Sequence, residues 1–542
     1  MKLFLSLVIL FGASFISCQA QEKKPKLVIG IVVDQMRTEM LDRYQPVFGN
    51  DGFNRLLENG QFYANAQYDH IPTYTGPGHA SIVTGSYPSV HGIVANDWYR
   101  RETGVTLNCV VDSAYQTLGL KNRSVGNSPN QMLSPTLADE MELASQGKSL
   151  TYSISIKDRS ALFSGGFASD GSFWYEGSSG KFITSTFFMD ETPKWLKTFN
   201  KKELALGYMT DWNLLYPAKN YSIGATSDDQ PYEKKFPNLE KHVFPYKLKE
   251  ITKDIGPTRM LASSPGGNTI LVDLAEEIIS SNGLGKDNIT DFLSIGFSSP
   301  DYVGHYWGTY SMELMDIYAR LDKDIARLLK FLDNSVGKDN YLIYLTADHG
   351  GTDPHEVLEK NKIPHGELDF PAIQLELEAF LAKKYGQGPW VLNISNDQVY
   401  INYQTINHVG IDLNAVADEI GDWFMKIKGI RMALSSYNFK NIDYTDHIRR
   451  PLQNGYYPGR SGDVLLFMDP NYMGASGIPT LHGSSFTYDR NVPLIFYGTD
   501  VVKGKSWENV KVYDIAPTVC AKVGVKAPAG SIGNVLIKVM SK

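Results

Sequence analysis

Residues that can bind a metal lie close to apolar segments that are far apart along the chain. These are 26–33 with Asp34, 291–297 with Asp301 and His305, 341–346 with Asp348 and His349, and 491–498, which shortly follows His482. Strands of a covered parallel sheet form continuous apolar runs, and ligands bind beyond the carboxyl ends of such strands. A site built from these residues therefore requires both ends of the chain to join one fold.

Helical patterns alternate with the apolar segments. Amphipathic periodicity is clearest over residues 268–281 and 311–335. This alternation predicts an α/β fold with a mainly parallel central sheet flanked by helices. The length of 542 residues would by itself suggest several domains. Because Asp34 and His482 must meet, we expect residues 21–542 to form a single domain instead.

Two segments are predicted to be insertions that cover the cleft of this domain. The first, at about 167–265, is rich in Tyr, Pro, Gly and Lys and has the irregular centre FPNLEKHVFPYKLKE. The second, at about 366–475, contains a helix–strand pattern and the loop NGYYPGRSG.

The N-terminal residues 1–20 have the pattern of an export signal. Lys2 precedes an apolar run at 3–16, and small residues follow. Cleavage after Ala20 predicts a periplasmic or secreted protein, while lipidation at Cys18 is the alternative and would anchor it to a membrane. No other apolar run reaches about 18 residues, so we expect no membrane span in the mature chain.

Charge and cysteine content limit the classes of partner and of metal site. The net charge is −7 and the pI is near 5.9, without a basic stripe, so we expect no nucleic-acid partner. Cys109 and Cys520 are the cysteines beyond the signal, and neither lies in a CxxC pattern. Cysteine-ligated zinc is therefore excluded, whereas a disulfide between these two residues stays open.

The aspartates and histidines after the apolar segments suit zinc. They are three carboxylates and three imidazoles, enough for two ions with three protein ligands each and an open position. Each pair alone is better explained as a turn or a loop cap. The joint arrangement at the ends of several strands favours metal binding.

The stretch PTYTGPGHASIVTG, residues 72–85, places Thr75 before two glycines and a short helical run. Taken alone, this pattern favours a helix cap, since Thr is a good N-cap and Pro fits the first turn. The alternative is a nucleophilic hydroxyl at a helix start, where backbone N–H groups can receive an anion.

Six motifs in order resemble the alkaline phosphatase superfamily. They are IVVDQMR, TYTGPGHASIVTG, VANDWY, SPDYVGHYWG, TADHGG and LHGSSF, and the similarity covers essentially the whole mature chain. The pattern is most similar to the PafA-like bacterial alkaline phosphatases, which use a Thr nucleophile. No clear equivalent of the magnesium site of the Ser-nucleophile branch is present.

The resemblance implies a two-zinc site and a phosphothreonine intermediate. One zinc would be held by Asp34, Asp348 and His349 together with Thr75, and the other by Asp301, His305 and His482, while Asn96 would donate to the phosphoryl group. In this mechanism the Thr75 hydroxyl attacks phosphorus, and the metals stabilise the attacking and leaving oxygens.

The choice of substrate depends on SISIKDRSALFSGG, residues 153–166. Alone, its Lys157 and Arg159 are most simply a solvated turn. The PafA-like enzymes place a Lys and an Arg in this pattern against the phosphate, where they suit a monoester dianion. We therefore expect a monomeric alkaline phosphatase acting on small phosphate monoesters. The alternatives are a nucleotide pyrophosphatase/phosphodiesterase with the same zinc site, or an exported phosphate-binding protein without turnover.

Overall fold

The computed structural model describes residues 23–239 and 241–540. The expected export signal at 1–20 lies outside these residues. In the described part of the chain, every helix is too short or too polar to cross a membrane.

A sheet of twelve strands forms the centre of the molecule. Its order is β19 (Gly504–Ser506), β2 (Gln61–Gln67), β18 (Asn491–Gly498), β11 (Tyr341–Thr346), β1 (Leu27–Val33), β10 (Asp291–Phe297), β7 (Thr151–Ser155), β8 (Gly171–Glu176), β9 (Lys181–Ser185), β5 (Val111–Leu118) and β6 (Val125–Asn127), with β20 (Val510–Lys511) beside β2. The five neighbours β11, β1, β10, β7 and β8 run parallel. Antiparallel strands extend the sheet on both sides.

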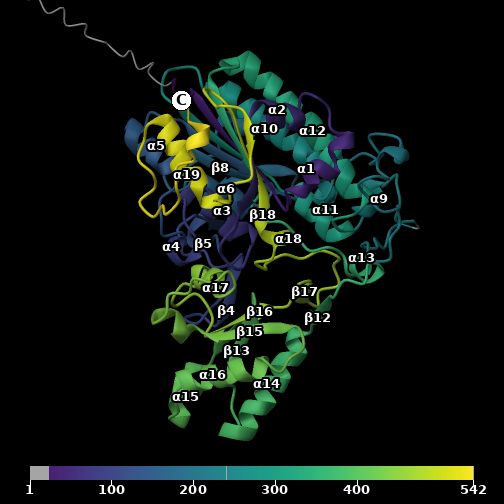
Figure 1. Cartoon of the computed structure of the whole chain (residues 1–542). Helices are drawn as coiled ribbons and strands as arrows, with labels where there is room; N and C mark the ends of the chain where they lie inside the picture. Colours follow the sequence, from purple (N-terminus) through teal and green to yellow (C-terminus); the bar gives the residue numbers. More distant parts are fainter. Residues whose placement is uncertain (1–22, 240, 541–542) are drawn as a thin grey trace, which may run out of the picture.

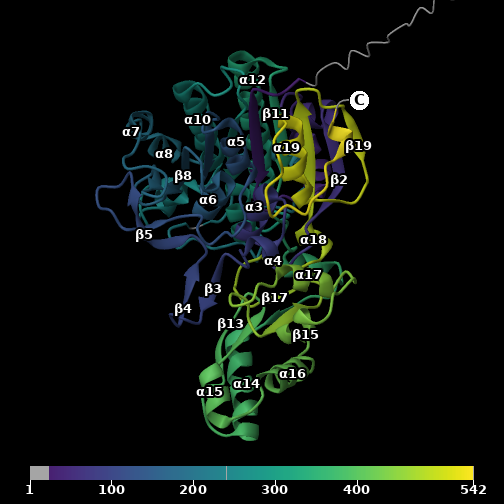
Figure 2. The ribbon, with the colours of Figure 1, turned by 90° about the vertical axis from the view of Figure 1, so that its left-hand side faces the viewer.

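The parallel centre is apolar because helices cover both of its faces (Figures 1 and 2). Every residue of β1, β10 and β11 is buried. One face carries α2 (Phe53–Asn59), α10 (Pro265–Asn282) and α12 (Met312–Leu332). The other carries α3 (Thr75–Thr84), α5 (Leu137–Ser145), α6 (Asp158–Gly165) and α19 (Ile515–Val523). These layers agree with the α/β fold that the apolar runs predict.

Residues 366–475 form a smaller lobe with its own sheet and core, below the large sheet in Figure 1. The sheet has the order β13 (Val391–Ser395), β14 (Gln398–Ile401), β16 (Val464–Met468) and β15 (Ile430–Ser435). Its helices are α14 (Phe370–Tyr385), α15 (Tyr403–Val409), α16 (Leu413–Phe424) and α17 (Arg449–Gly455). A parallel pair, β12 (Gly366–Leu368) and β17 (Tyr472–Gly474), lies at the two ends of this segment.

The other expected insertion, at about 167–265, begins inside the central sheet, because β8 and β9 belong to that sheet. Its remainder contains α7 (Lys194–Lys201), α8 (Leu204–Tyr208) and α9 (Leu248–Ile251), of which α7 and α8 pack against α10. The buried carboxylate of Asp316 on α12 anchors this segment. It accepts hydrogen bonds from Trp212 Nε1, the Leu215 amide and the Tyr221 hydroxyl at 2.5–2.7 Å.

Candidate metal centre and active site

Most of the candidate residues lie at the carboxyl ends of four neighbouring parallel strands. Asp34 follows β1, Asp348 and His349 follow β11, Asp301 and His305 lie on α11 (Ser299–Trp307) after β10, and Lys157 lies between β7 and α6. His482 comes from the loop before α18 (Thr487–Arg490), which leads into β18. Parallel pairing brings these ends to one edge of the sheet, so residues up to 448 positions apart in the sequence meet there.

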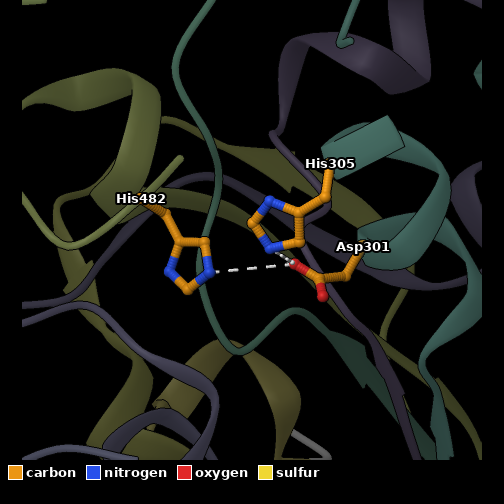
Figure 3. A group of neighbouring side chains, drawn as sticks. All are labelled: Asp301, His305 and His482. Carbon is orange, nitrogen blue, oxygen red and sulfur yellow. Dashed lines mark ion pairs between the residues drawn. The ribbon is translucent and has the colours of Figure 1, made fainter. Parts of the chain in front are cut away.

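Asp301, His305 and His482 form the first group of candidate ligands (Figure 3). Asp301 and His305 are four residues apart on α11, which puts both side chains on one face of the helix. The Nε2 atoms of His305 and His482 lie 3.1 and 3.8 Å from Asp301 Oδ1. In Figure 3 both rings turn toward this carboxylate from different elements.

Asp34, Asp301 and His349 form a second group, so Asp301 contributes to both. His349 Nε2 lies 3.4 Å from Asp34 Oδ1 and 3.5 Å from Asp348 Oδ2. The ring of His349 also stacks on that of His482, with ring centroids 3.6 Å apart. All six predicted ligands thus lie around one buried centre.

Backbone carbonyls set the proton position of all three candidate histidines. The Nδ1 atoms of His305, His349 and His482 lie 2.7–2.8 Å from the carbonyl oxygens of Thr480, Gly350 and Thr73, respectively. A carbonyl can only accept, so each Nδ1 carries the hydrogen and each Nε2 presents its lone pair. Burial lowers the pKa of His349 to about 3, which keeps this ring neutral.

The donor set fits zinc. Asp34 and Asp348 are buried, and Asp34 Oδ1 and Asp348 Oδ2 have no hydrogen-bond donor among the described residues. Leaving buried carboxylate oxygens without donors is costly unless a cation neutralises them. Carboxylate oxygens and imidazole nitrogens, without thiolates, are ligands of catalytic zinc sites.

Thr75 points its hydroxyl into this centre. It is the first residue of α3, whose N-cap is Tyr74, and no side chain caps the helix. Thr75 Oγ1 lies 3.2 Å from Lys157 Nζ and 3.4 Å from His349 Nε2. The local sequence alone favours a cap, but the hydroxyl instead faces the candidate ligands.

Glycine at position 78 lets the start of α3 approach the loop after β11. A Cβ atom there would lie 2.3 Å from the backbone oxygen of Asp348. Gly78→Ala is therefore expected to shift Asp348, to cost about 1–3 kcal/mol of stability through overpacking, and to lower activity by about 10²-fold through misplacement of the site. Gly207→Ala is the control. Its added Cβ would have no atom within 4 Å, so neither stability nor activity should change. Thermal unfolding and steady-state kinetics of both variants measure these effects, and a fully active Gly78→Ala enzyme would show that this close approach is unimportant.

Asn96 lies beside Thr75. Its Oδ1 accepts a hydrogen bond of 2.8 Å from the backbone N–H of Gly76. This bond orients the amide and leaves its NH₂ group as a donor at the edge of the site. Asn96 also lines a cleft of about 450 Å³ together with His305 and His482.

Lys157 contacts the candidate ligands rather than the open cleft. Its Nζ lies 2.7 Å from Asp34 Oδ2 and 2.6 Å from Asp301 Oδ2, in addition to its contact with Thr75. Burial disfavours the charge, yet Asp301 and Asp34 raise the pKa of Lys157 above its ordinary value. Two buried carboxylates attract the nearest ammonium, an effect that the KDR pattern by itself does not reveal.

Arg159 lies in the first turn of α6 and is half-buried. The closest ion-pair contact of its guanidinium is with Asp158, at 4.0 Å, and its buried Nε has no acceptor among the described residues. Arg159 is thus near the centre without being bound to the candidate ligands.

The lobe of residues 366–475 forms one wall of the cleft. It contributes Phe370, Ile394, Asp397, Met468 and Tyr472. Tyr74, Asp97 and Tyr488 of the large domain line the opposite side. The cleft thus opens directly onto the candidate ligands His305 and His482.

Two contacts of the site were not predicted from the sequence. Gln35 has a positive φ of 63°. Its side-chain Nε2 donates to Asp301 Oδ1 at 2.8 Å, and its backbone N–H donates to Asp348 Oδ1 at 3.2 Å. The sequence feature that could have revealed this role is that Gln35 directly follows the candidate ligand Asp34. His79 is also buried, and its Nε2 lies 3.8 Å from Asp348 Oδ2.

Two further histidines and the two cysteines lie apart from the candidate ligands. His355 and His365, which follow the TADHGG motif, lie with ring centroids 4.9 Å apart, and His355 Nε2 bonds the Asn471 carbonyl. Cys109 and Cys520 are buried free thiols and do not form a disulfide.

The family model of type I phosphodiesterases/nucleotide pyrophosphatases matches residues 28–484. The chain is 36% identical to alkaline phosphatase PhoV of Synechococcus elongatus, with 98% of both proteins covered. It is also 36% identical to a Myroides odoratus protein named calcium-transporting ATPase (95% of both covered). Identity to alkaline phosphatase PafA of Elizabethkingia meningoseptica is 35%, over 96% of this chain and 95% of PafA.

A crystal structure of PafA matches with a TM-score of 0.92 and 35% identity, covering 96% of this chain and 99% of that one. This match confirms the predicted fold class, including the large central sheet between helices. The chain belongs to the type I phosphodiesterase/nucleotide pyrophosphatase family of the alkaline phosphatase superfamily.

Proposed function

We propose that the protein is an alkaline phosphatase that hydrolyses phosphate monoesters through a phosphothreonine at Thr75. The observation that carries the proposal is the Thr75 hydroxyl, which lies against the imidazole Nε2 of His349 and the ammonium of Lys157 at the carboxyl end of the sheet. The relatives PhoV and PafA, which are named alkaline phosphatases, support it.

Two zinc ions are the proposed cofactors. Asp34, Asp348 and His349 would hold one, and Asp301, His305 and His482 the other. When bound, the ions supply Lewis acidity that lowers the pKa of the Thr75 hydroxyl and stabilises the charge of the leaving oxygen. The three Nε2 lone pairs and the carboxylate oxygens without donors support this assignment.

The protein's own residues would bind and orient the phosphoryl group. Thr75 Oγ1 gives up its proton to solvent and attacks phosphorus, the new P–O bond forms as the ester P–O bond breaks, and the alcohol leaves with a proton from solvent. Water then attacks the phosphothreonine, the bond between phosphorus and Thr75 Oγ1 breaks, one proton of the water returns to Oγ1, and phosphate leaves. Asn96 and Arg159 donate to the equatorial oxygens, and Lys157, 3.2 Å from Thr75 Oγ1, can donate to an oxygen of a phosphoryl group bonded there.

Lys157 and Arg159 should determine the preference for monoesters. A monoester dianion offers more charge than a diester monoanion, and each lost charge-assisted hydrogen bond costs about 1.5–3 kcal/mol. Arg159→Ala and Lys157→Ala are each expected to lower kcat/KM for monoesters by about 10- to 150-fold, with a much smaller loss for diesters. Kinetics of each variant on a monoester and on a diester measure the difference.

Lys157 also contacts two candidate ligands, so zinc content must be measured in parallel. Arg159→Ala separates the effect on substrate preference from an effect on zinc binding, because Arg159 forms no ion pair with the candidate ligands. Equal losses on both substrate classes, at unchanged zinc content, would assign these residues a structural role and favour the diesterase.

The family model itself favours a second candidate function, a nucleotide pyrophosphatase/phosphodiesterase. Product analysis on a panel of monoesters, diesters and ATP separates the two. The phosphatase releases inorganic phosphate from monoesters, whereas the diesterase releases a monoester from a diester, and AMP with pyrophosphate from ATP. ATP is included because one relative is named an ATPase. A protein that hydrolyses none of these compounds would instead be a phosphate-binding protein.

We further propose that residues 1–20 direct export, so that the enzyme acts as a periplasmic or secreted monomer on small phosphate monoesters. The completeness of the candidate site within one chain supports the monomer. The position of 366–475 along the cleft supports its role as a cap over the substrate.

A further inference from the structure

A second group of carboxylates lies outside the candidate active site, where the segment after α8 meets the start of α12. It consists of Asp228, Glu233 and Glu313. One oxygen atom of each of these side chains lies within 4.8 Å of the other two. Glu313 is in the first turn of α12, and the other two residues lie in the irregular loop that precedes α9.

Each of these three side chains has one oxygen that accepts a hydrogen bond and one that does not. Glu313 Oε1 accepts from the Tyr246 hydroxyl, Glu233 Oε2 from the Gln230 amide and Asp228 Oδ2 from the Phe244 amide, at 2.7–3.1 Å. The remaining oxygens, Glu313 Oε2, Glu233 Oε1 and Asp228 Oδ1, are buried and have no donor. Glu313 is 0% exposed and Glu233 3%, so solvent does not compensate for the missing donors.

Within residues 23–239 and 241–540, no lysine, arginine or histidine forms an ion pair with these three carboxylates. The two nearest lysines in the sequence are engaged elsewhere, since Lys235 Nζ pairs with Asp229 at 3.1 Å and Lys234 Nζ lies over the Tyr306 ring. Three buried carboxylates this close together repel one another, and each is costly to bury unpaired.

Other buried carboxylates of the chain show that the arrangement is unusual. Asp316, one turn further along α12, accepts hydrogen bonds at both oxygens from four donors. Asp322, nine residues beyond Glu313 on the same helix, uses both oxygens for the Gly49 and Phe53 amides. Clustered carboxylate oxygens without donors occur at the candidate zinc centre and at this second group.

We propose that Asp228, Glu233 and Glu313 bind a hard divalent cation, calcium, at a site separate from the zinc centre. Three carboxylates without imidazole or thiolate form the donor set of calcium rather than that of zinc. Asp228 is half-buried, so the group lies close to the surface of the molecule. One ion satisfies the three remaining oxygens and removes their mutual repulsion.

The cation would connect the 228–246 segment to the helix that carries two candidate zinc ligands. Trp307, at the end of α11, donates to the Tyr246 hydroxyl at 2.9 Å, and that hydroxyl donates to Glu313. The Lys234 amide also bonds the Tyr306 carbonyl. The site thus has a structural role, holding α11 and α12 against the loop without contacting the substrate.

Terbium luminescence on the full-length, zinc-loaded protein tests the site. Tb³⁺ takes the place of Ca²⁺ at oxygen sites, and the nearby Tyr246 and Trp307 can sensitise its emission. We expect a saturable signal that Ca²⁺ displaces at lower concentration than Mg²⁺. Glu313→Gln and, separately, Glu233→Gln should each weaken Tb³⁺ and Ca²⁺ binding by at least about tenfold. Ca²⁺ should raise the melting temperature of the wild type and not of these variants.

Asp229→Asn is the matched control, since it removes the same charge from the neighbouring, exposed residue and should leave the affinity unchanged. The Gln variants preserve shape, and unchanged phosphatase activity per bound zinc verifies their folding. If one of the two Gln variants is misfolded, the Tb³⁺ and Ca²⁺ affinities of the other variant test the proposal. Tb³⁺ binding that both Gln variants retain would overturn the proposal. A wild type that neither binds Ca²⁺ nor is stabilised by it would also overturn it, because the carboxylates would then be held protonated.

Discussion

Thr75→Ala is expected to abolish the phosphoenzyme and to lower kcat/KM for monoesters by at least about 10⁴-fold, the scale seen when a nucleophile is removed. The fold should persist, because Thr75 forms no capping hydrogen bond and its side chain faces the candidate ligands. Acid-quenched enzyme analysed by mass spectrometry detects the covalent phosphate, and steady-state assays give the rate.

Thr75→Ser is the matched control for this variant. It keeps the hydroxyl and loses only a methyl group, so it should form the phosphoenzyme and retain substantial activity. An alanine variant that turns over like the parent would show that Thr75 only begins a helix, and the covalent mechanism would then be wrong.

His482→Ala is expected to lower zinc content from about two ions per chain to about one and to lower kcat/KM by at least about 10³-fold. The second ion supplies several kcal/mol of charge stabilisation, at 1.4 kcal/mol per tenfold change in rate. Asp301→Ala should reduce occupancy of both sites, because Asp301 belongs to both groups of candidate ligands. Metal analysis of the purified variants, alongside kinetics, measures both effects.

His408→Ala provides the control, since it removes an exposed imidazole on α15 and should change neither zinc content nor rate. Full activity of the wild type with less than one bound divalent ion would contradict the two-metal account. Undiminished zinc in both His482→Ala and Asp301→Ala would contradict the ligand assignment.

The fold and the proximity of the candidate ligands could be predicted because strands buried on both faces are continuous apolar runs, which are easy to recognise in a sequence. The strands before Asp34 and Asp348 are buried on both sides, so they are apolar throughout, and their parallel pairing then brings those residues to one edge. Asp301 and His305 follow from helical spacing after a strand of the same kind.

Other features depend on tertiary contacts that have no local pattern. The strands at 171–176 and 181–185 belong to the central sheet, although the aromatic and polar residues around them suggested an insertion. The ion pairs of Lys157 arise from carboxylates 123 and 144 residues away. The hydrogen bonds of Gln35 depend on its left-handed backbone, which the sequence does not specify.

The most direct test of the account is the ratio of kcat/KM for a monoester and a diester that share one leaving group, such as p-nitrophenyl phosphate and bis(p-nitrophenyl) phosphate. Two charge-assisted hydrogen bonds from Lys157 and Arg159, at about 1.5 kcal/mol or more each, predict that the zinc-loaded enzyme favours the monoester by at least about 100-fold. An enzyme that hydrolyses the diester as well as or better than the monoester would contradict the account and identify the protein as a phosphodiesterase.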